Sequence, residues 1–256
     1  MDIIAENLLE FEGDYDLKRE YWLILIIYIA MQLSSLIGVP LIMGFLHNLG
    51  KNPALAVPYW LIFSFAIALI MILYILRKEF NPNSYERKGS SFGGSFVWAL
   101  FGVFLALFAQ TVAANIEQLF GIPVGSNNTK EILKIIQAFP FAILVSSIIG
   151  PILEEIVFRK IIFGALYGRF NFFISALISS VIFALAHQEP QHILLYSSMG
   201  FTFAFLYVKT KHIVVPMFAH IAMNTFVVLI QIVYKGDIEK ISKTVHGIQN
   251  FIGGFL

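Results

Sequence analysis

The chain has 256 residues, of which 58% are hydrophobic and only 13% are charged. Soluble domains carry about 25% charged residues, so a soluble protein of this length is excluded. The 17 basic and 16 acidic side chains nearly cancel, which excludes a basic nucleic-acid-binding protein. Disorder and a disulfide scaffold are also excluded, because the mean hydropathy is +0.80 and cysteine is absent. The composition predicts an integral membrane protein.

Residues 1–20 are polar and acidic and precede the hydrophobic part of the chain. They lack the basic start and early apolar run of a cleavable signal peptide. We expect this segment to lead into a single integral membrane domain, so that residues 1–256 form one unit.

The hydrophobic part divides into about seven stretches that can cross a bilayer, a crossing that takes roughly 20 apolar residues. Backbone groups in lipid must be satisfied within the chain, and the period-2 alternation of a barrel strand is absent. We predict an all-α, polytopic transmembrane helical bundle of about seven to eight membrane helices. The predicted spans, of which the fifth and sixth are short, are Tyr21–Leu46, Pro58–Leu76, Ser95–Leu119, Phe141–Tyr167, Phe172–His187, His192–Val208 and Ile213–Tyr234.

The connections between these stretches carry turn residues and charge. We expect loops at Arg77–Ser91 and Gly121–Thr129. The segment Lys130–Phe139 has apolar residues at helical spacing, which is typical of an amphipathic helix at the membrane interface. The tail after Lys235 has a similar pattern and is expected to form an interfacial helix or an eighth membrane element.

The distribution of Lys and Arg over the short loops predicts the orientation. Ten of these residues gather on one side of the predicted bundle and six on the other, which favours a cytoplasmic N-terminus. The first group is Lys18, Arg19, Arg77, Lys78, Arg87, Lys88, Lys160, Arg169, Lys209 and Lys211, and the second is Lys51, Lys130, Lys134, Lys235, Lys240 and Lys243.

The fourth span carries the charges of Glu154, Glu155 and Arg159, although a charge at the bilayer centre costs roughly 2.5–3.5 kcal/mol on insertion scales. Glu155 and Arg159 are four residues apart and can pair on one helix face. Neighbouring helical residues point about 100° apart, so we expect that Glu154 and Glu155 cannot both face one cavity. Glu154 then has no obvious partner on its own helix. Gly150–Pro151 can loosen this helix and let water approach.

Two histidines lie at or within later spans. His187 ends the fifth span, and His220 lies inside the seventh, four residues before Asn224 and on the same face. A carboxylate beside an imidazole can activate a water, and a second imidazole with an amide can stabilise an oxyanion. The same groups, Glu154, His187 and His220, could instead hold a divalent metal such as zinc. The spacing leaves both alternatives open.

Structural explanations are available for several of these residues. Glu155 and Arg159 could form a buried pair that only fixes helix packing, and an Asn in a span often joins helices. We expect the remaining histidines to be interfacial, and polar residues of the third span to help line a wet cavity. The remaining histidines are His47, His192, His212 and His246. The polar residues of the third span are Gln110, Asn115 and Glu117.

At these positions the sequence resembles the CPBP intramembrane proteases, also called the CAAX protease and bacteriocin-processing (Abi) family. The family's motifs are EExxxR, FxxxH and a His followed four residues later by a small or polar residue. They occur here in the family's order, on separate predicted spans, within the region 141–234 that we take as the catalytic core. The matching residues are Glu154, Glu155, Arg159, Phe183, His187, His220 and Asn224.

The resemblance implies a membrane endopeptidase that cleaves a peptide or protein, with or without a prenyl group. By analogy, Glu154 and His187 activate the water, while His220 and Asn224 form the oxyanion site. The other motif residues are supporting. Family members have been described both as metal-dependent and as metal-free glutamate proteases, so the resemblance leaves the cofactor open. Bacterial members are associated with peptide processing or self-immunity, and the composition suits a prokaryotic cell membrane.

Two other classes of protein remain as alternatives. Buried Glu and His also form relays in proton- or ion-coupled transporters, although the sequence lacks the related halves that many transporters show. The chain could also be a non-catalytic immunity protein that keeps the motifs but binds a partner.

Overall fold

The computed structural model describes residues 18–79, 90–123 and 125–233, and every regular element in these ranges is helical. The predicted all-α fold is therefore confirmed. The polar segment before Lys18, most of the predicted Arg77–Ser91 loop, and the tail after Val233 with His246 lie outside the described residues. The elements are α2 (Arg19–Asn48), η1 (Pro53–Leu55), α3 (Ala56–Leu76), α4 (Phe92–Leu119), α5 (Asn127–Ala138), η2 (Pro140–Ala142), η3 (Val145–Ile149), α6 (Gly150–Glu154), η4 (Glu155–Phe163), α7 (Gly164–Tyr167), α8 (Phe172–Ala186), η5 (Pro190–His192), α9 (Ile193–Thr210) and α10 (Val214–Val233).

Six helices in the described part of the chain are long and apolar enough to cross a membrane, and α8 is a shorter apolar helix. Each of the seven predicted stretches corresponds to one of these elements, with ends that differ by only a few residues. The fourth span is a chain of short elements from Pro140 to Tyr167. The predicted interfacial segment forms α5, which begins three residues earlier than expected.

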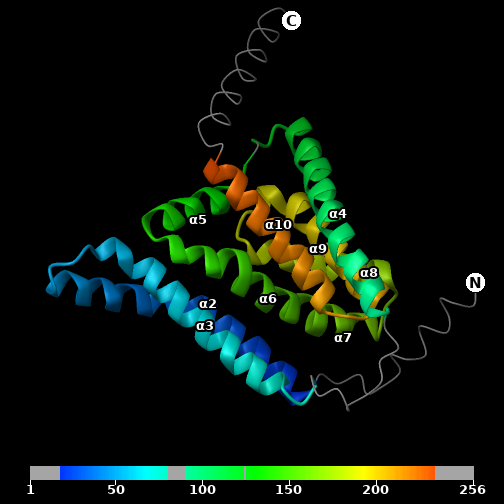
Figure 1. Ribbon diagram of the computed structural model, residues 1–256, viewed down its shortest axis with the longest axis horizontal. Coiled ribbons are helices and arrows are strands. Elements are labelled where there is room, and N and C mark those ends of the chain that lie inside the picture. Colours follow the sequence, from blue (N-terminus) through cyan, green and yellow to red (C-terminus); the bar gives the residue numbers. More distant parts are fainter. Residues whose placement is uncertain (1–17, 80–89, 124, 234–256) are drawn as a thin grey trace, which may run out of the picture.

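The helices form a bundle in which α2 and α3 run side by side along one flank and α4 runs along the other (Figure 1). The fourth span, α9 and α10 lie between these flanks, and α8 packs against α9. Side chains such as Leu153, Phe183 and Phe203 are fully buried in this central region. The outer faces of α2, α3 and α4 carry exposed Phe, Leu and Ile, which suits contact with lipid chains.

Local hydrogen bonds explain where several helices begin. The side chains of Ser91, Ser126 and Asn171 accept hydrogen bonds from backbone N–H groups in the first turns of α4, α5 and α8. These residue types are the preferred N-caps. The caps satisfy donors that would otherwise be unpaired at a helix start.

The fourth span departs from a regular α-helix at two places. Residues Val145–Ile149 and Glu155–Phe163 are π-helical, on either side of the short α6 that starts at Gly150. The sequence expectation that Gly150–Pro151 loosens this helix is therefore confirmed, although the widening extends well beyond the pair. π-Helical turns are rare and are frequent at functional sites.

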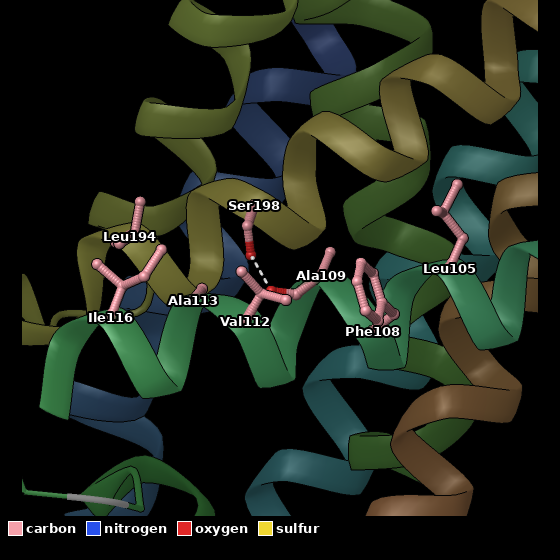
Figure 2. A pocket seen from close by; sticks show the side chains of 8 residues that line it. All are labelled: Leu105, Phe108, Ala109, Val112, Ala113, Ile116, Leu194 and Ser198. Carbon is pink, nitrogen blue, oxygen red and sulfur yellow. Dashed lines mark hydrogen bonds between the residues drawn. The ribbon is translucent and has the colours of Figure 1, made fainter. Parts of the chain in front are cut away.

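A shallow groove of about 340 Å³ lies between α4 and α9, on the flank that α4 forms (Figure 2). Its walls are apolar, and its one hydroxyl, that of Ser198, donates to the carbonyl of Ala109 at 3.3 Å. The groove thus presents no unpaired polar side chain, and none of the motif residues lines it. It is a lipid-facing depression rather than a reaction site.

Helices α8 and α9 approach each other closely at Gly200. A Cβ atom at this position would lie 2.9 Å from Cβ and 3.0 Å from Cα of Ser180. Because the obstacle is backbone and the first side-chain carbon, the neighbour cannot move aside cheaply. The close approach matters for the site, since α8 carries His187 at its end.

Glu79 forms ion pairs and a hydrogen bond that link the ends of three membrane helices. Its carboxylate lies 2.7 Å from Lys160 Nζ and 3.6 Å from Lys18 Nζ, and it accepts a hydrogen bond from the Tyr21 hydroxyl at 3.2 Å. Burial raises the pKa of Glu79, but the hydrogen bond and charge of Lys160 outweigh it, so that the pKa lies below its usual value. Glu79 thus joins α2, α3 and the fourth span.

We predict that Gly200→Ala lowers the free energy of unfolding by about 1–3 kcal/mol, as overpacking of a close contact does. Gly44→Ala is the matched control, because Gly44 also lies within a helix, α2, and a Cβ there meets nothing within 4 Å. Thermal unfolding of both variants in the same detergent measures the difference. Equal stability of the two variants would show that the α8–α9 contact can relax.

We predict that Glu79→Gln lowers the free energy of unfolding by about 1 kcal/mol at neutral pH. A carboxyl group with a lowered pKa stabilises the fold above its unfolded-state pKa, and this contribution is lost as the pH falls through the lower folded-state value. The variant and the wild type should therefore converge in stability in strong acid. Glu131→Gln removes a carboxylate that is 65% exposed beside Lys134 and should have little effect at any pH.

Candidate active site

The expected ion pair inside the fourth span is present. Arg159 Nε lies 3.2 Å from Glu155 Oε2, and the two side chains are 1% and 0% exposed. The guanidinium also lies over the ring of Phe183, 4.3 Å from its centroid, and 5.2 Å from that of Phe203. The pair and the two aromatic faces together balance a charge buried within the membrane domain.

Both carboxylates of the fourth span approach the imidazole of His220. Glu155 Oε1 lies 2.8 Å from Nδ1, and Glu154 Oε2 lies 3.7 Å from Nε2. The two glutamates therefore lie at the two nitrogens of one imidazole although they are adjacent in the chain. An imidazole ring offers a nitrogen on each of two edges, and Glu154 and Glu155 stand at the junction of α6 and the π-helix η4, where the regular angular spacing is lost.

These contacts also specify the protons on His220. An ionised Glu155 can only accept, so His220 Nδ1 carries a proton. Glu155 thus does more than pair with Arg159, because it also orients His220.

His187 caps the C-terminal end of α8 and lies in the same region. Its Nδ1 donates to the carbonyl of Phe183 at 2.8 Å, which leaves Nε2 free to accept a proton. The Phe183 ring lies between the two imidazoles, 4.6 Å from the centroid of His187 and 6.0 Å from that of His220.

Asn224 follows His220 by one turn of α10 and is partly buried. One hydrogen of its amide is donated to the carbonyl of Ser146 at 3.3 Å. This carbonyl belongs to the first π-helical stretch of the fourth span. The remaining amide hydrogen and oxygen of Asn224 are available to a ligand beside His220.

The irregular chain after α8 has two buried polar side chains, while Gln188, Pro190 and Gln191 are exposed. Glu189 and His192 are 7% and 4% exposed. His192 Nδ1 lies 2.7 Å from Glu117 Oε2, and Glu117 Oε1 accepts from the backbone N–H of Leu195 at 2.8 Å. The prediction that His192 is interfacial is therefore wrong, because Glu117 of α4 binds it in the interior.

The other polar residues considered from the sequence lie in different settings. His47 is exposed at the end of α2, as expected. His212 is half-buried, and its Nε2 lies 3.1 Å from the carbonyl oxygen of Ser90. Asn115 is exposed and donates to the Thr111 carbonyl of its own helix, so it lines no inner cavity. Gln110 is half-buried.

Sequence reasoning missed the role of Glu189, which joins the loop after His187 to the start of α5. Its carboxylate accepts hydrogen bonds from the Asn127 and Asn128 N–H groups and from the Ser126 and Tyr196 hydroxyls. An acidic residue next to an apolar helix was the available signal. The three partners at the start of α5 lie 61 to 63 residues earlier in the chain, so spacing could not identify them.

The residues that could hold a metal do not form a metal-binding group. Within the described ranges, no three His, Cys, Asp or Glu side chains are arranged to bind one ion. Of the three candidate ligands, Glu154, His187 and His220, the last has its Nδ1 hydrogen-bonded to Glu155. The arrangement of these side chains does not fit a three-ligand zinc site.

We predict that Glu155→Gln lowers the free energy of unfolding by about 3–5 kcal/mol, since it leaves the Arg159 charge buried without its carboxylate. The double variant Glu155→Leu/Arg159→Met removes both charges and should recover most of the loss. Chemical unfolding in detergent compares the three proteins. A single variant as stable as the wild type would mean that Glu154 alone can balance Arg159.

Comparison with known proteins places this geometry in a family. Residues 136–226 match the family described as "Type II CAAX prenyl endopeptidase Rce1-like", a range that contains every motif residue. No solved structure matches the chain.

Two bacterial relatives align over most of the chain. The chain is 50% identical over 221 residues to "Putative membrane peptidase YdiL" of Bacillus subtilis, covering 84% of this chain and 91% of the relative. It is 36% identical over 226 residues to "Membrane-embedded CAAX protease MroQ" of Staphylococcus aureus, covering 85% and 91%. With its motifs brought together between the fourth span, α8 and α10, the chain belongs to the CAAX protease family of integral-membrane endopeptidases that its sequence resembles.

Proposed function

We propose that this chain hydrolyses a peptide bond within the membrane, with Glu154, His187, His220 and Asn224 as the catalytic residues. The observation that carries the proposal is the contrast between the two carboxylates beside His220. Glu155 is fully buried and held by Arg159, whereas the side chain of Glu154 is 20% exposed and lies at 3.7 Å from its nearest imidazole nitrogen. Glu154 therefore keeps the freedom and the access to solvent that a reacting group needs.

Glu154 and His187 supply the base. The Nδ1 hydrogen bond to Phe183 leaves His187 Nε2 as a proton acceptor. A water placed between this nitrogen and the Glu154 carboxylate loses a proton as its oxygen attacks the substrate carbonyl. The same proton then passes to the leaving amine as the peptide C–N bond breaks, so water is the only other reactant.

His220 and Asn224 stabilise the negative charge that develops on the carbonyl oxygen. With Nδ1 donating to Glu155, a protonated Nε2 of His220 donates to this oxygen, and the second amide hydrogen of Asn224 adds another donor. Donors fixed in advance in a buried site need no reorganisation during the reaction. Glu155, Arg159 and Phe183 support the site by holding the two imidazoles.

The substrate that fits this site is a membrane-associated peptide or protein. The S. aureus relative is named a CAAX protease, so lipidated and unlipidated forms of one peptide are the relevant comparison. We also propose that the N-terminus faces the cytoplasm, on the basis of the excess of Lys and Arg in the loops on that side. The water is activated by side chains alone in this proposal.

We predict that Glu154→Gln and His187→Ala each lower kcat by about 10²–10⁴-fold, which is the usual contribution of a positioned general base. Purified protein in liposomes is incubated with a mixture of membrane-associated precursor peptides, with and without a prenyl group, and the products are identified by mass spectrometry. Glu154→Gln should not unfold the protein, because Glu154 makes no close hydrogen bond in the described structure.

Glu131→Gln is the matched control, since it removes an exposed carboxylate from α5 and should leave cleavage unchanged. Cleavage at the wild-type rate by Glu154→Gln would end the catalytic assignment. Proton flux into the same liposomes that depends on Glu154, without any cleavage, would support the transporter alternative instead.

A further inference from the structure

The ring of His187 is held by a residue outside the family motifs. The ring of Tyr196, in the first turns of α9, stacks on the imidazole with centroids 4.0 Å apart and planes 26° apart. The Phe183 ring meets the same imidazole edge-on, at an interplanar angle of 67°. The Nδ1 hydrogen bond fixes one nitrogen of His187, and the stack with Tyr196 fixes the plane in which the other nitrogen lies.

Tyr196 is itself held at its hydroxyl. The hydroxyl donates to Glu189 Oε2 at 2.9 Å and lies 2.9 Å from the Ser126 hydroxyl oxygen. Tyr196 is 5% exposed and Glu189 is 7% exposed. Hydrogen bonds to a buried carboxylate are stronger than those between neutral groups, so this contact limits how far the Tyr196 ring can tilt.

Glu189 connects the stack to α5. Its Oε1 accepts from the N–H groups of Asn127 and Asn128 at 2.6 and 3.0 Å, where the helix dipole favours a negative charge. Gln188 has a left-handed backbone, with φ of 57°, and this turn carries the chain from His187 back to Glu189. The contacts therefore run unbroken from the start of α5 to His187.

Helix α5 lies outside the membrane spans and is only partly covered. Ile136 is its one fully buried residue, and Ile132, Leu133 and Ile135 pack around it against Ala142 and Val228. Lys130 and Lys134 lie on the opposite, polar side. Because so little apolar surface anchors α5, the hydrogen bonds to Glu189 are a large part of what docks its first turn.

We propose that Glu189 and Tyr196 are positioning residues for His187, and that docking of the α5 N-terminus on Glu189 sets the orientation of the His187 ring. This inference rests on the proposed function, in which His187 is the base. Neither residue touches the reacting atoms. They act by keeping His187 Nε2 directed at the water beside Glu154, where a small displacement is costly to the rate.

The test uses Tyr196→Phe, which keeps the stacked ring but removes the hydroxyl, and Glu189→Gln. The matched control is Tyr207→Phe, because Tyr207 lies on the same helix, is 8% exposed and takes no part in these contacts. Kinetics use a peptide that the wild type cleaves in liposomes. We expect kcat to fall about 10-fold or more in both test variants, with KM nearly unchanged, and no change in the control.

A second readout does not depend on a substrate. With ¹³C-labelled histidine in detergent, the His187 ring signal is assigned by its loss in His187→Ala. Loss of the Tyr196 hydroxyl or the Glu189 charge should shift or broaden this signal, and Tyr207→Phe should not. The double variant Tyr196→Phe/Glu189→Gln should have a kcat no lower than that of the poorer single variant, because both changes break the same chain of contacts.

An unshifted His187 signal together with unchanged kcat in Tyr196→Phe and Glu189→Gln would overturn the proposal. A shifted signal in a protein that cleaves no peptide would instead support the positioning contacts and count against the proposed function. The two inferences can therefore fail separately.

Discussion

The structure depends on how one positive charge is accommodated inside the bundle. Arg159 is 1% exposed, and such a charge is tolerated only with a partner in place. Glu155 supplies that partner from one turn away and is therefore fixed in position. Its second oxygen then binds His220 Nδ1, so the requirement to balance Arg159 also orients an imidazole on α10. A structural ion pair thereby becomes the support of the candidate active site.

The sequence predicts those features that depend on near neighbours. Apolar stretches of membrane-spanning length predict the helices, and the spacing of Glu155 and Arg159 predicts their ion pair. The partners of His192 and Glu189 could not be found in this way. Glu117 lies 75 residues from His192, and such pairings arise only from the packing of α4 against α9. Hydrophobic periodicity carries no information about which buried carboxylate meets which distant donor.

The π-helical backbone of the fourth span could not be predicted from the geometry of a regular α-helix. Gly150–Pro151 indicates a weak point, and the structure widens the helix on both sides of it. The angular spacing of an ideal α-helix would turn Glu154 away from the ring that Glu155 binds. The change of helix type between these two residues instead places one carboxylate at each nitrogen of His220. The propensities of single residues do not predict such a change.

The buried carboxylates of the described chain differ in how fully they are used. Glu117 binds His192 and the start of α9, Glu155 binds Arg159 and His220, and Glu189 binds the start of α5. Glu117 and Glu189 accept hydrogen bonds through both oxygens, and Glu155 accepts one through Oε1 while its Oε2 forms the ion pair with Arg159. Moving any of the three would leave a donor or a charge unpaired. Glu154 differs, because its one ion-pair contact in the described residues is at 3.7 Å and its side chain is 20% exposed. A carboxylate that can change its proton or its partner without dismantling the fold is the one suited to chemistry, which is why we propose Glu154 as the reacting group.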